Sequence, residues 1–433
     1  MASAPRAPTP PARIHWHRTA TDAPVCEALR GAHTADVVVI GGGLTGTRTA
    51  LGLAEDGASV ALLEAREIGF GASGRSGGQC NPMWRQTPDE LAAILGDDVA
   101  ARLVETTIGA ADALFEDISR YGIACDAEQN GWVQAAHSAS ARRSIGRLAE
   151  AWSAAGADIR VLEGAEVHTA TGSMAYDFAL KHAKGGSVQP LSLTRGFARA
   201  AQRFGARLFE QSPVRAIERD GAGWRVRSDQ GSVTAPRIIL TTNGYTDDLW
   251  PRLRQTFYPM VSIILATAPL SGTLQKSVLP GAVTISDSRR AIYYARYDRH
   301  RRLVFGCMGS KEDPAVLGGV ARLKRGLRTV FPQLSDTPVE ACWGGTIAVT
   351  PKMMPHLHEP APGILAGLGF SGRGIAMTSV MARTLLRRAL GAAEETLPFP
   401  VTPIEPVPLH GLTTRALPLL APVAALRDRL DRR

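Results

Sequence analysis

Cysteine is scarce in this 433-residue chain, and its placement excludes two kinds of structural site. The five cysteines are odd in number and widely spaced, and no two of them form a C-x-x-C pair. A zinc site or a disulfide framework needs clustered cysteines. We therefore expect neither, and we predict no metal site. A reducing, cytoplasmic location fits this pattern best.

Long apolar runs are also missing. None approaches the ~20 residues that a membrane-spanning helix needs. The N-terminal stretch MASAPRAPTPPARIHWHRTA is too rich in proline for a signal peptide, and about a dozen or more of its residues are expected to be disordered. The net charge of +9 comes from scattered arginines without a basic run of five. It favours anionic small molecules, and no nucleic-acid or membrane partner is expected.

Glycine, by contrast, is concentrated directly after apolar strands. Residues 37–40 are four apolar residues typical of a buried strand. The glycines that follow in the pattern G-x-G-x-x-G are Gly41, Gly43 and Gly46. Residues 44–56 have helical spacing, and a second strand over 58–63 ends at Glu64. This order predicts a dinucleotide-binding unit, with a pyrophosphate at the helix N-terminus and Glu64 on the ribose.

Two further glycine-rich segments could contact the same ligand. Residues 69–79 (GFGASGRSGGQ) follow soon after Glu64, and their backbone N–H groups, Ser73 and Arg75 can donate to phosphate or ring oxygens. Residues 367–372 (GLGFSG) repeat the glycine pattern, but no strand ending in an acid follows their helix. We therefore expect a single bound nucleotide, and we expect the turn at 367–372, the late glycine turn, to direct the N-terminus of its helix toward that nucleotide.

The rest of the chain mixes helical spacing with hairpin signals. Residues 88–120 and 138–156 have helical spacing, and residues 290–302 predict a hairpin. Strand alternation places Tyr293 on one face of this hairpin and Arg296 on the other, and which face lines a pocket stays open. Three histidines are expected on loops in contact with solvent rather than in catalysis: His182, His356 and His358.

Four segments carry a resemblance to a known family. ADVVVIGGGLTG, LLEAREIGFGASGRSGGQ, TTNGYT and GLGFSGRGIAMTS stand in the order seen in FAD-dependent amine oxidoreductases of the D-amino-acid oxidase class. The chain is most similar to the γ-glutamylputrescine oxidoreductase branch, relatives of sarcosine oxidase, over nearly its whole length. The resemblance implies an α/β (α+β) fold, in which a Rossmann-like FAD-binding domain is interleaved with an antiparallel-sheet substrate domain.

The resemblance also implies the domain boundaries. The FAD-binding domain would comprise residues 34–90, 186–250 and 340–392, and the substrate domain residues 91–185 and 251–339. Residues 1–33 would form a lead-in, and residues 393–433 a C-terminal tail.

The same resemblance implies which residues hold the FAD. They are Gly41, Gly43, Leu44, Thr45, Gly46, Glu64, Ala65, Arg66, Ser73, Arg75, Gly77, Gly78, Gln79, Val214, Gly372, Arg373, Gly374 and Ile375. Many relatives have Gly-His-Gly where this chain has Gly-Arg-Gly at 372–374, a fixed cation that would favour a reduced, anionic flavin. The cysteine that bonds covalently to the flavin in sarcosine oxidase relatives corresponds to Gly345, and the nearest cysteine is Cys342. We therefore expect non-covalent FAD.

The implied activity is oxidation of an amine C–N bond, in which hydride passes to the flavin and the imine product hydrolyses. Oxygen or an electron carrier would reoxidise the flavin. The arginine-rich hairpin favours a carboxylate-bearing substrate, for example a γ-glutamylated amine. The candidate catalytic residues are Tyr293, Arg296 as the carboxylate partner, and Arg373. Two alternatives stay open: a flavin-bound sensing or structural protein without turnover, and an NAD-linked dehydrogenase, against which the second and third glycine segments argue.

Overall fold

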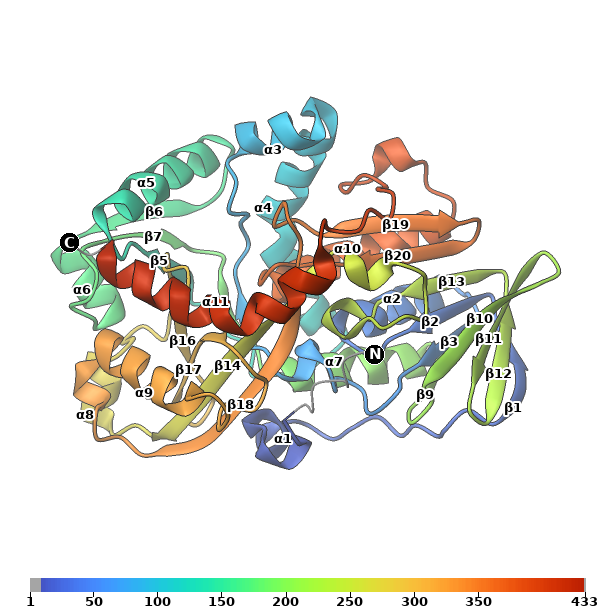
Figure 1. Cartoon of the computed structure of the whole chain (residues 1–433), viewed down its shortest axis with the longest axis horizontal. Helices are drawn as coiled ribbons and strands as arrows, with labels where there is room; N and C mark the ends of the chain where they lie inside the picture. Colours follow the sequence, from blue (N-terminus) through green and yellow to red (C-terminus); the bar gives the residue numbers. More distant parts are fainter. Residues whose placement is uncertain (1–8, 432–433) are drawn as a thin grey trace.

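The computed structural model describes residues 9–431 and is organised around two large sheets (Figure 1). The six-stranded sheet has the order β19 (His356–Ala361), β20 (Ile364–Leu368), β13 (Arg237–Leu240), β2 (Val37–Ile40), β3 (Val60–Leu63) and β9 (Arg207–Phe209). The eight-stranded sheet has the order β18 (Val339–Val349), β14 (Tyr258–Pro269), β17 (Arg302–Gly309), β16 (Tyr293–Tyr297), β15 (Thr284–Asp287), β5 (Trp132–Ala135), β7 (Phe178–His182) and β6 (Ile159–Glu163).

Two smaller sheets and a set of helices complete the structure. The four-stranded sheet has the order β1 (Gly31–Thr34), β12 (Gly231–Ala235), β11 (Gly223–Ser228) and β10 (Val214–Asp220). The two-stranded sheet pairs β4 (Gln79–Cys80) with β8 (Gly186–Ser187). The α-helices are α1 (His15–Thr19), α2 (Leu44–Glu55), α3 (Pro88–Leu95), α4 (Asp97–Arg120), α5 (Ala139–Ala154), α6 (Ala165–Thr171), α7 (Pro190–Arg203), α8 (Gly272–Ser277), α9 (Gly319–Val330), α10 (Gly374–Ala389) and α11 (His410–Leu430). The predicted α/β (α+β) class is confirmed.

The central strand β2 shows why the six-stranded sheet lies between two layers. Successive strand side chains point to opposite faces. Val37 and Val39 pack into the core that includes α2, α7 and α10, whereas Val38 and Ile40 pack toward the β1-β12-β11-β10 sheet. Strand β2 runs parallel to β3 and β13, and β13 runs parallel to β20. The segments that follow these four strands therefore gather at one edge of the sheet.

The eight-stranded sheet also has two distinct faces. One face carries Ala295, Tyr297 and Phe305 into a core shared with α9. The other face carries Tyr294 and Trp343 toward α7 and the lead-in. Strand β18, which lies in the segment expected to belong to the FAD-binding domain from residue 340, pairs with β14 at the edge of this sheet.

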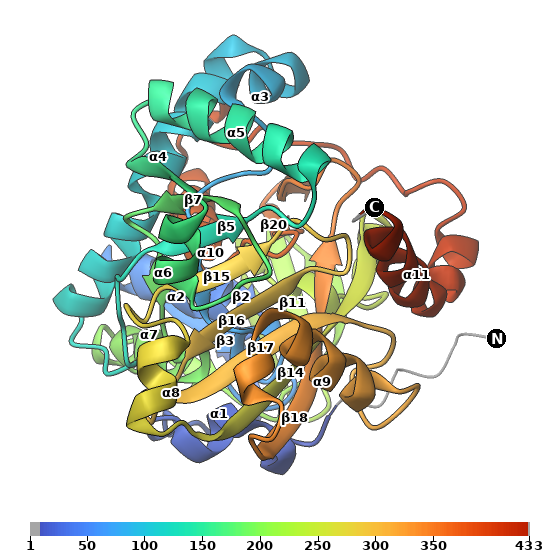
Figure 2. The same cartoon turned by 90° about the vertical axis from the view of Figure 1, so that its left-hand side faces the viewer.

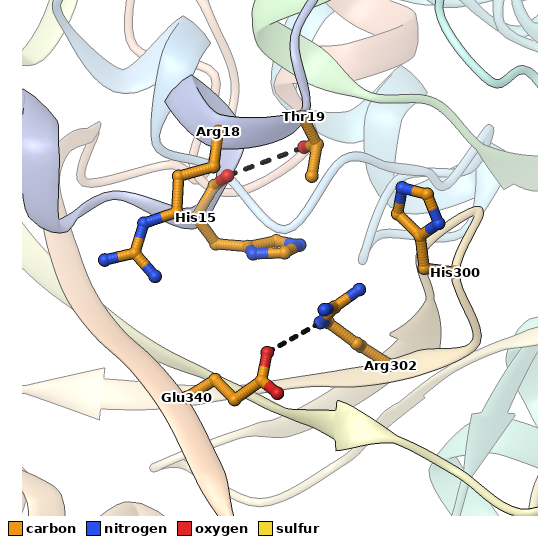
Figure 3. Close-up of a pocket in the computed structure, with 6 residues that line it drawn as sticks. All are labelled: His15, Arg18, Thr19, His300, Arg302 and Glu340. Atoms are coloured by element: carbon orange, nitrogen blue, oxygen red, sulfur yellow. Dashed lines mark hydrogen bonds and ion pairs between the residues drawn. The ribbon is translucent and has the colours of Figure 1, made fainter.

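The lead-in is folded from residue 9 onward. Trp16 is fully buried and donates from Nε1 to the Ser76 carbonyl at 2.8 Å, and Thr9 donates to the Glu312 carbonyl at 2.7 Å. A surface hollow of about 260 Å³ lies where α1 meets β17 and β18, and Arg302 there pairs with Glu340 (Figure 3). Residues 1–8 lie outside the described range. The expected disorder is therefore wrong for residues 9–20, because buried aromatic packing fixes them.

The C-terminal tail ends in the long helix α11, which crosses the front of the molecule (Figure 1). It contains Pro418 and Pro422. Because Pro422 has no N–H, the Pro418 carbonyl lacks its helical partner, and the Ser310 hydroxyl donates to it at 2.8 Å. Within residues 9–431, no helix is both long enough and apolar enough to cross a membrane.

Candidate cofactor and substrate site

The first glycine turn is shaped by close backbone approach. Gly41 has φ +109°, and a Cβ on Gly46 would lie 2.0 Å from the Gly41 carbonyl oxygen. Only glycine lets α2 begin this close to β2. Gly43 is the extended N-cap of α2 and offers no side chain, and the Leu44 N–H instead donates to the Ser73 hydroxyl at 2.9 Å. The positive end of α2 is thus open to an anion held beside Ser73.

Glu64 closes the other side of this turn. Its carboxylate accepts from the Gly42 N–H at 2.7 Å and from the Arg66 N–H at 2.9 Å, and burial raises its pKa. The Ser212 N–H donates to the Glu64 carbonyl at 2.9 Å, which brings the start of β10 at Val214 to the same end of the sheet. Ala65 and Arg66 are exposed. Glu64, expected on the ribose, and Val214, also expected to contact the FAD, therefore lie on neighbouring segments.

The second glycine loop is fixed between the two large sheets. A Cβ on Gly77 would lie 2.7 Å from the Tyr294 ring, and one on Gly78 would lie 2.2 Å from the Val188 carbonyl oxygen. Gln79 donates to the Ala295 carbonyl at 2.9 Å. Arg75 donates to the carbonyls of Phe70 and Thr9, both at 2.8 Å, and only its Nη2 lacks a hydrogen-bond partner among the described residues. This loop therefore presents backbone, Ser73 and one guanidinium nitrogen to a ligand.

The segment TTNGYT contributes residues that the sequence reasoning did not assign. Asn243 accepts from the Gly369 N–H at 2.9 Å and so joins this segment to the late glycine turn. Tyr245 donates to Oε1 of the buried Glu312 carboxylate at 3.0 Å. The other carboxylate oxygen of Glu312, Oε2, has no hydrogen-bond partner within residues 9–431. The available signal was the position of TTNGYT directly after a buried strand that runs parallel to β2.

Arg373 stands at the N-terminus of α10, which has no side-chain cap. Its side chain is 5% exposed, and the guanidinium lies 4.8 Å from the centre of the Trp132 ring. Its Nε has no hydrogen-bond partner in the described part of the chain. Burial, together with the charge of Arg85, holds the pKa of Arg373 well below its ordinary value.

Arg85, which the sequence reasoning missed, is the second cation here. It is exposed, yet the surrounding protein desolvates its guanidinium enough to lower its pKa. Neither Arg85 nor Arg373 forms an ion pair or side-chain hydrogen bond with any residue from 9 to 431. We call Arg85, Trp132, Gln134, Tyr294 and Arg373 the inter-sheet site.

Strand alternation assembles the remaining members of the inter-sheet site. Trp132 and Gln134 lie two residues apart on β5, and Trp132 donates to the Ser286 hydroxyl at 2.8 Å. Ser286 is directly opposite Tyr294 in the sheet. The Tyr294 hydroxyl lies 2.7 Å from the Ser262 hydroxyl, and Gln134 Oε1 has no hydrogen-bond partner in the range 9–431. Among the described residues, the site thus combines two cations without an ion-pair partner and one acceptor without a hydrogen bond.

Two of the three predicted catalytic residues do not fit their predicted role. Tyr293 packs against Phe305 on the α9 side of the sheet, so it points away from the glycine loop. Arg296 is buried, and its three nitrogens donate to the carbonyls of Gly77, Tyr297 and Val188. It is therefore occupied in holding the loop. The strand pattern indicated two faces correctly but could not tell which one turns inward.

The three histidines are not on solvated loops. His182 ends β7, and His356 and His358 lie on β19 with their rings 5.2 Å apart. His182 and His358 are each only 1% exposed. The expected loop placement is wrong for all three, and the expected solvent contact is wrong for His182 and His358. His356 is half-buried and pairs with Leu368, beside the late glycine turn.

The residues at this sheet edge fit an FAD molecule. The tight Gly41–Gly46 approach, the uncapped start of α2 and the Glu64 carboxylate suit an adenosine diphosphate. The orphaned nitrogens of Arg75 and Arg373 suit the electron-rich end of a flavin or an anion beside it.

The comparisons with known proteins agree with this geometry. Residues 36–388 match the family described as "FAD dependent oxidoreductase". The chain is 32% identical to the γ-glutamylputrescine oxidoreductase of Escherichia coli (93% of this chain, 95% of the relative) and 30% identical to a probable oxidoreductase, OrdL, of Rhizobium meliloti (90% and 91%). Its fold is similar to that of glycine oxidase from Geobacillus kaustophilus, with a TM-score of 0.72 at 20% identity (86% and 99%). The resemblance noted in the sequence is confirmed, and the chain belongs to the FAD-dependent oxidoreductase family of the D-amino-acid oxidase class.

Proposed function

We propose that this protein oxidises the C–N bond of an amine that also carries a carboxylate, using non-covalently bound FAD. The observation that carries the proposal is the pair of cations in the inter-sheet site, Arg85 and Arg373, which have no ion-pair partner among residues 9–431. Of the two, Arg373 is buried, and a buried charge without a charged partner among residues 9–431 is a cost to folding. An anionic group of the substrate would offset that cost on binding.

A carboxylate suits this pair better than other anions do. The guanidinium is a planar fork that can donate to both carboxylate oxygens at once. The Trp132 ring, 4.8 Å from the Arg373 guanidinium, restricts the plane in which that fork lies. The name of the Escherichia coli relative, γ-glutamylputrescine oxidoreductase, describes a substrate that contains both an amine and a carboxylate. A γ-glutamylated or similar amine is therefore the favoured class.

Bound FAD would supply the hydride acceptor, and this chain's residues place the amine. Arg85 and Arg373 would fix the carboxylate end, and Gln134 Oε1 can accept a hydrogen bond from the amine nitrogen. Burial raises the pKa of Tyr294, so its hydroxyl stays protonated and shares a hydrogen bond with Ser262. It can donate to substrate but cannot act as a base at neutral pH. The site therefore suits an amine that binds in its neutral form.

The cysteine positions support non-covalent FAD. Cys342 packs toward the α9 side of the sheet, whereas its neighbour Trp343 donates to the Arg75 carbonyl on the opposite face. Cys307 lies in that same α9-side core. Cys80 is fully buried in the core beneath α4, and burial raises its pKa to about 12. None of these thiols faces the glycine loop.

An anaerobic reduction assay tests the proposal. The purified holoprotein would be mixed with γ-glutamylated and other carboxylate-bearing amines, and with matched amines that lack the carboxylate. We expect the oxidised flavin absorbance to bleach with the first group at much lower concentrations. No bleaching with any amine would support the sensing alternative, and equal bleaching by both groups would refute the carboxylate preference. Reoxidation by admitted air or by an added carrier then identifies the oxidant.

A further inference from the structure

Helix α11 turns its apolar side chains to solvent. Of the fourteen exposed large apolar side chains in residues 9–431, seven lie between residues 409 and 430, with exposures of 44% to 72%. The other seven are scattered between residues 25 and 390. We call the clustered set the leucine stripe: Leu409, Leu412, Leu419, Leu420, Val423, Leu426 and Leu430. Exposed apolar clusters of this kind mark contact surfaces.

The inward side of α11 is held largely by polar contacts. Asp428 is buried and accepts from the backbone N–H groups of Arg290 and Ala291, both at 3.0 Å. At the opposite end, His410 Nε2 lies 3.0 Å from the Phe257 carbonyl oxygen. An ordinary surface helix buries its apolar side and exposes its polar side. Helix α11 buries Leu417 and Ala424 but leaves the leucine stripe in solvent, so its outer side is suited to a covering apolar phase.

The charges around the leucine stripe are positive. Arg415 and Arg427 are exposed on α11. The segment 410–431 has two acids: Asp428 is buried, and Asp431 is exposed and paired with Arg290. A hollow of about 470 Å³ at the start of the helix is lined by Arg254 and Arg415 beside Leu409 and Leu412. Arg254 also pairs with Asp248 at 2.6 Å, whereas Arg415 has no ion-pair partner among residues 9–431.

The shape of this surface favours a lipid bilayer over a second copy of the chain. Helix α11 has 21 residues, about 31 Å in length, and it lies at the edge of the molecule (Figure 2). Such a ridge can lie flat among headgroups with its apolar side in the acyl region. A stable protein interface usually needs about 20–30 residues on each side, and the leucine stripe has seven.

We propose that α11 docks this protein on a bilayer that contains anionic lipids. The leucine stripe would enter the acyl boundary, while Arg415 and Arg427 would contact headgroup phosphates. The hollow at the start of α11 offers one arginine and two leucines to a single lipid. Such a peripheral contact would go beyond the expectation that the protein has no membrane partner, and it requires no membrane-spanning helix.

Vesicle flotation of the full-length holoprotein tests the proposal. We expect co-flotation with phosphatidylcholine vesicles containing phosphatidylglycerol, and weaker binding to pure phosphatidylcholine or at high salt. The double variant Leu419→Glu with Val423→Glu should lower the partition coefficient at least about tenfold. The control variant Val161→Glu with Leu317→Glu changes two exposed apolar residues elsewhere and should float like the unmodified protein.

The flavin spectrum and the unfolding temperature show that each variant is folded. Failure of the unmodified protein to float with either vesicle would overturn the proposal, as would equal flotation of the α11 double variant. A dimer that the α11 variant abolishes, seen by light scattering without any vesicle binding, would assign the leucine stripe to a second copy instead.

Discussion

Replacing Arg373 by methionine separates its effect on substrate from its effect on stability. Methionine keeps the length of the side chain and can still pack on the Trp132 ring, but it removes the unpaired charge. If Arg373 donates to a substrate carboxylate, the variant loses a charge-assisted hydrogen bond worth roughly 1.5–3 kcal/mol. That corresponds to a roughly 10- to 150-fold lower kcat/KM for the carboxylated amine.

The same substitution should stabilise the flavin-free protein. Arg373 is buried, and its Nε has no hydrogen-bond partner in the part of the chain that the structure describes. Such a charge is a net cost to folding until an anion binds. We therefore expect the unfolding temperature of the flavin-free Arg373→Met variant to be equal to or above that of the unmodified protein. Arg387 lies on the same helix and is exposed, so Arg387→Met is a matched control that should change neither quantity.

The assay is stopped-flow flavin reduction with two substrates that differ only in the carboxylate. The expected result is a loss of rate for the carboxylated amine and little change for its partner. Equal losses for both would mean that Arg373 acts on the flavin or on the fold. A lower unfolding temperature would show that Arg373 has a stabilising partner, and the reasoning from its unpaired charge would fail.

Three further predictions follow from individual contacts. Gly46→Ala places a Cβ 2.0 Å from the Gly41 carbonyl oxygen and should abolish FAD binding, whereas Gly109→Ala, with open space around it, should purify yellow. Acid precipitation should leave the flavin in the supernatant, and colour in the pellet would refute non-covalent binding. Burial lowers the pKa of His182 to about 4, so unfolding, which restores its ordinary pKa of 6.5, takes up a proton between pH 6.5 and 4. Stability should therefore fall across that range, by about 2 kcal/mol at pH 5, and urea unfolding of His182→Gln should show a smaller loss.

The cofactor half of this protein could be predicted from the sequence because its signals are local. The run 37–40, the glycine spacing and the acid at the end of the next strand are each fixed by backbone sterics within about thirty residues. The Gly46 contact with the Gly41 carbonyl is such a local constraint. The family resemblance rests on the same segments and was confirmed.

The substrate half depended on contacts between residues distant in the chain. Alternation along 293–297 separated Tyr293 from Arg296, but only the packing of α9 and the lead-in decided which face turns inward. Arg85 carries no motif, and the fold alone brings its charge near Arg373. Proline disfavours a helix interior, yet α11 forms around Pro418 and Pro422, and the Ser310 hydroxyl satisfies a backbone carbonyl that Pro422 leaves without its helical partner. Local sequence specifies strands and turns, whereas burial and charge pairing exist only once the chain has folded.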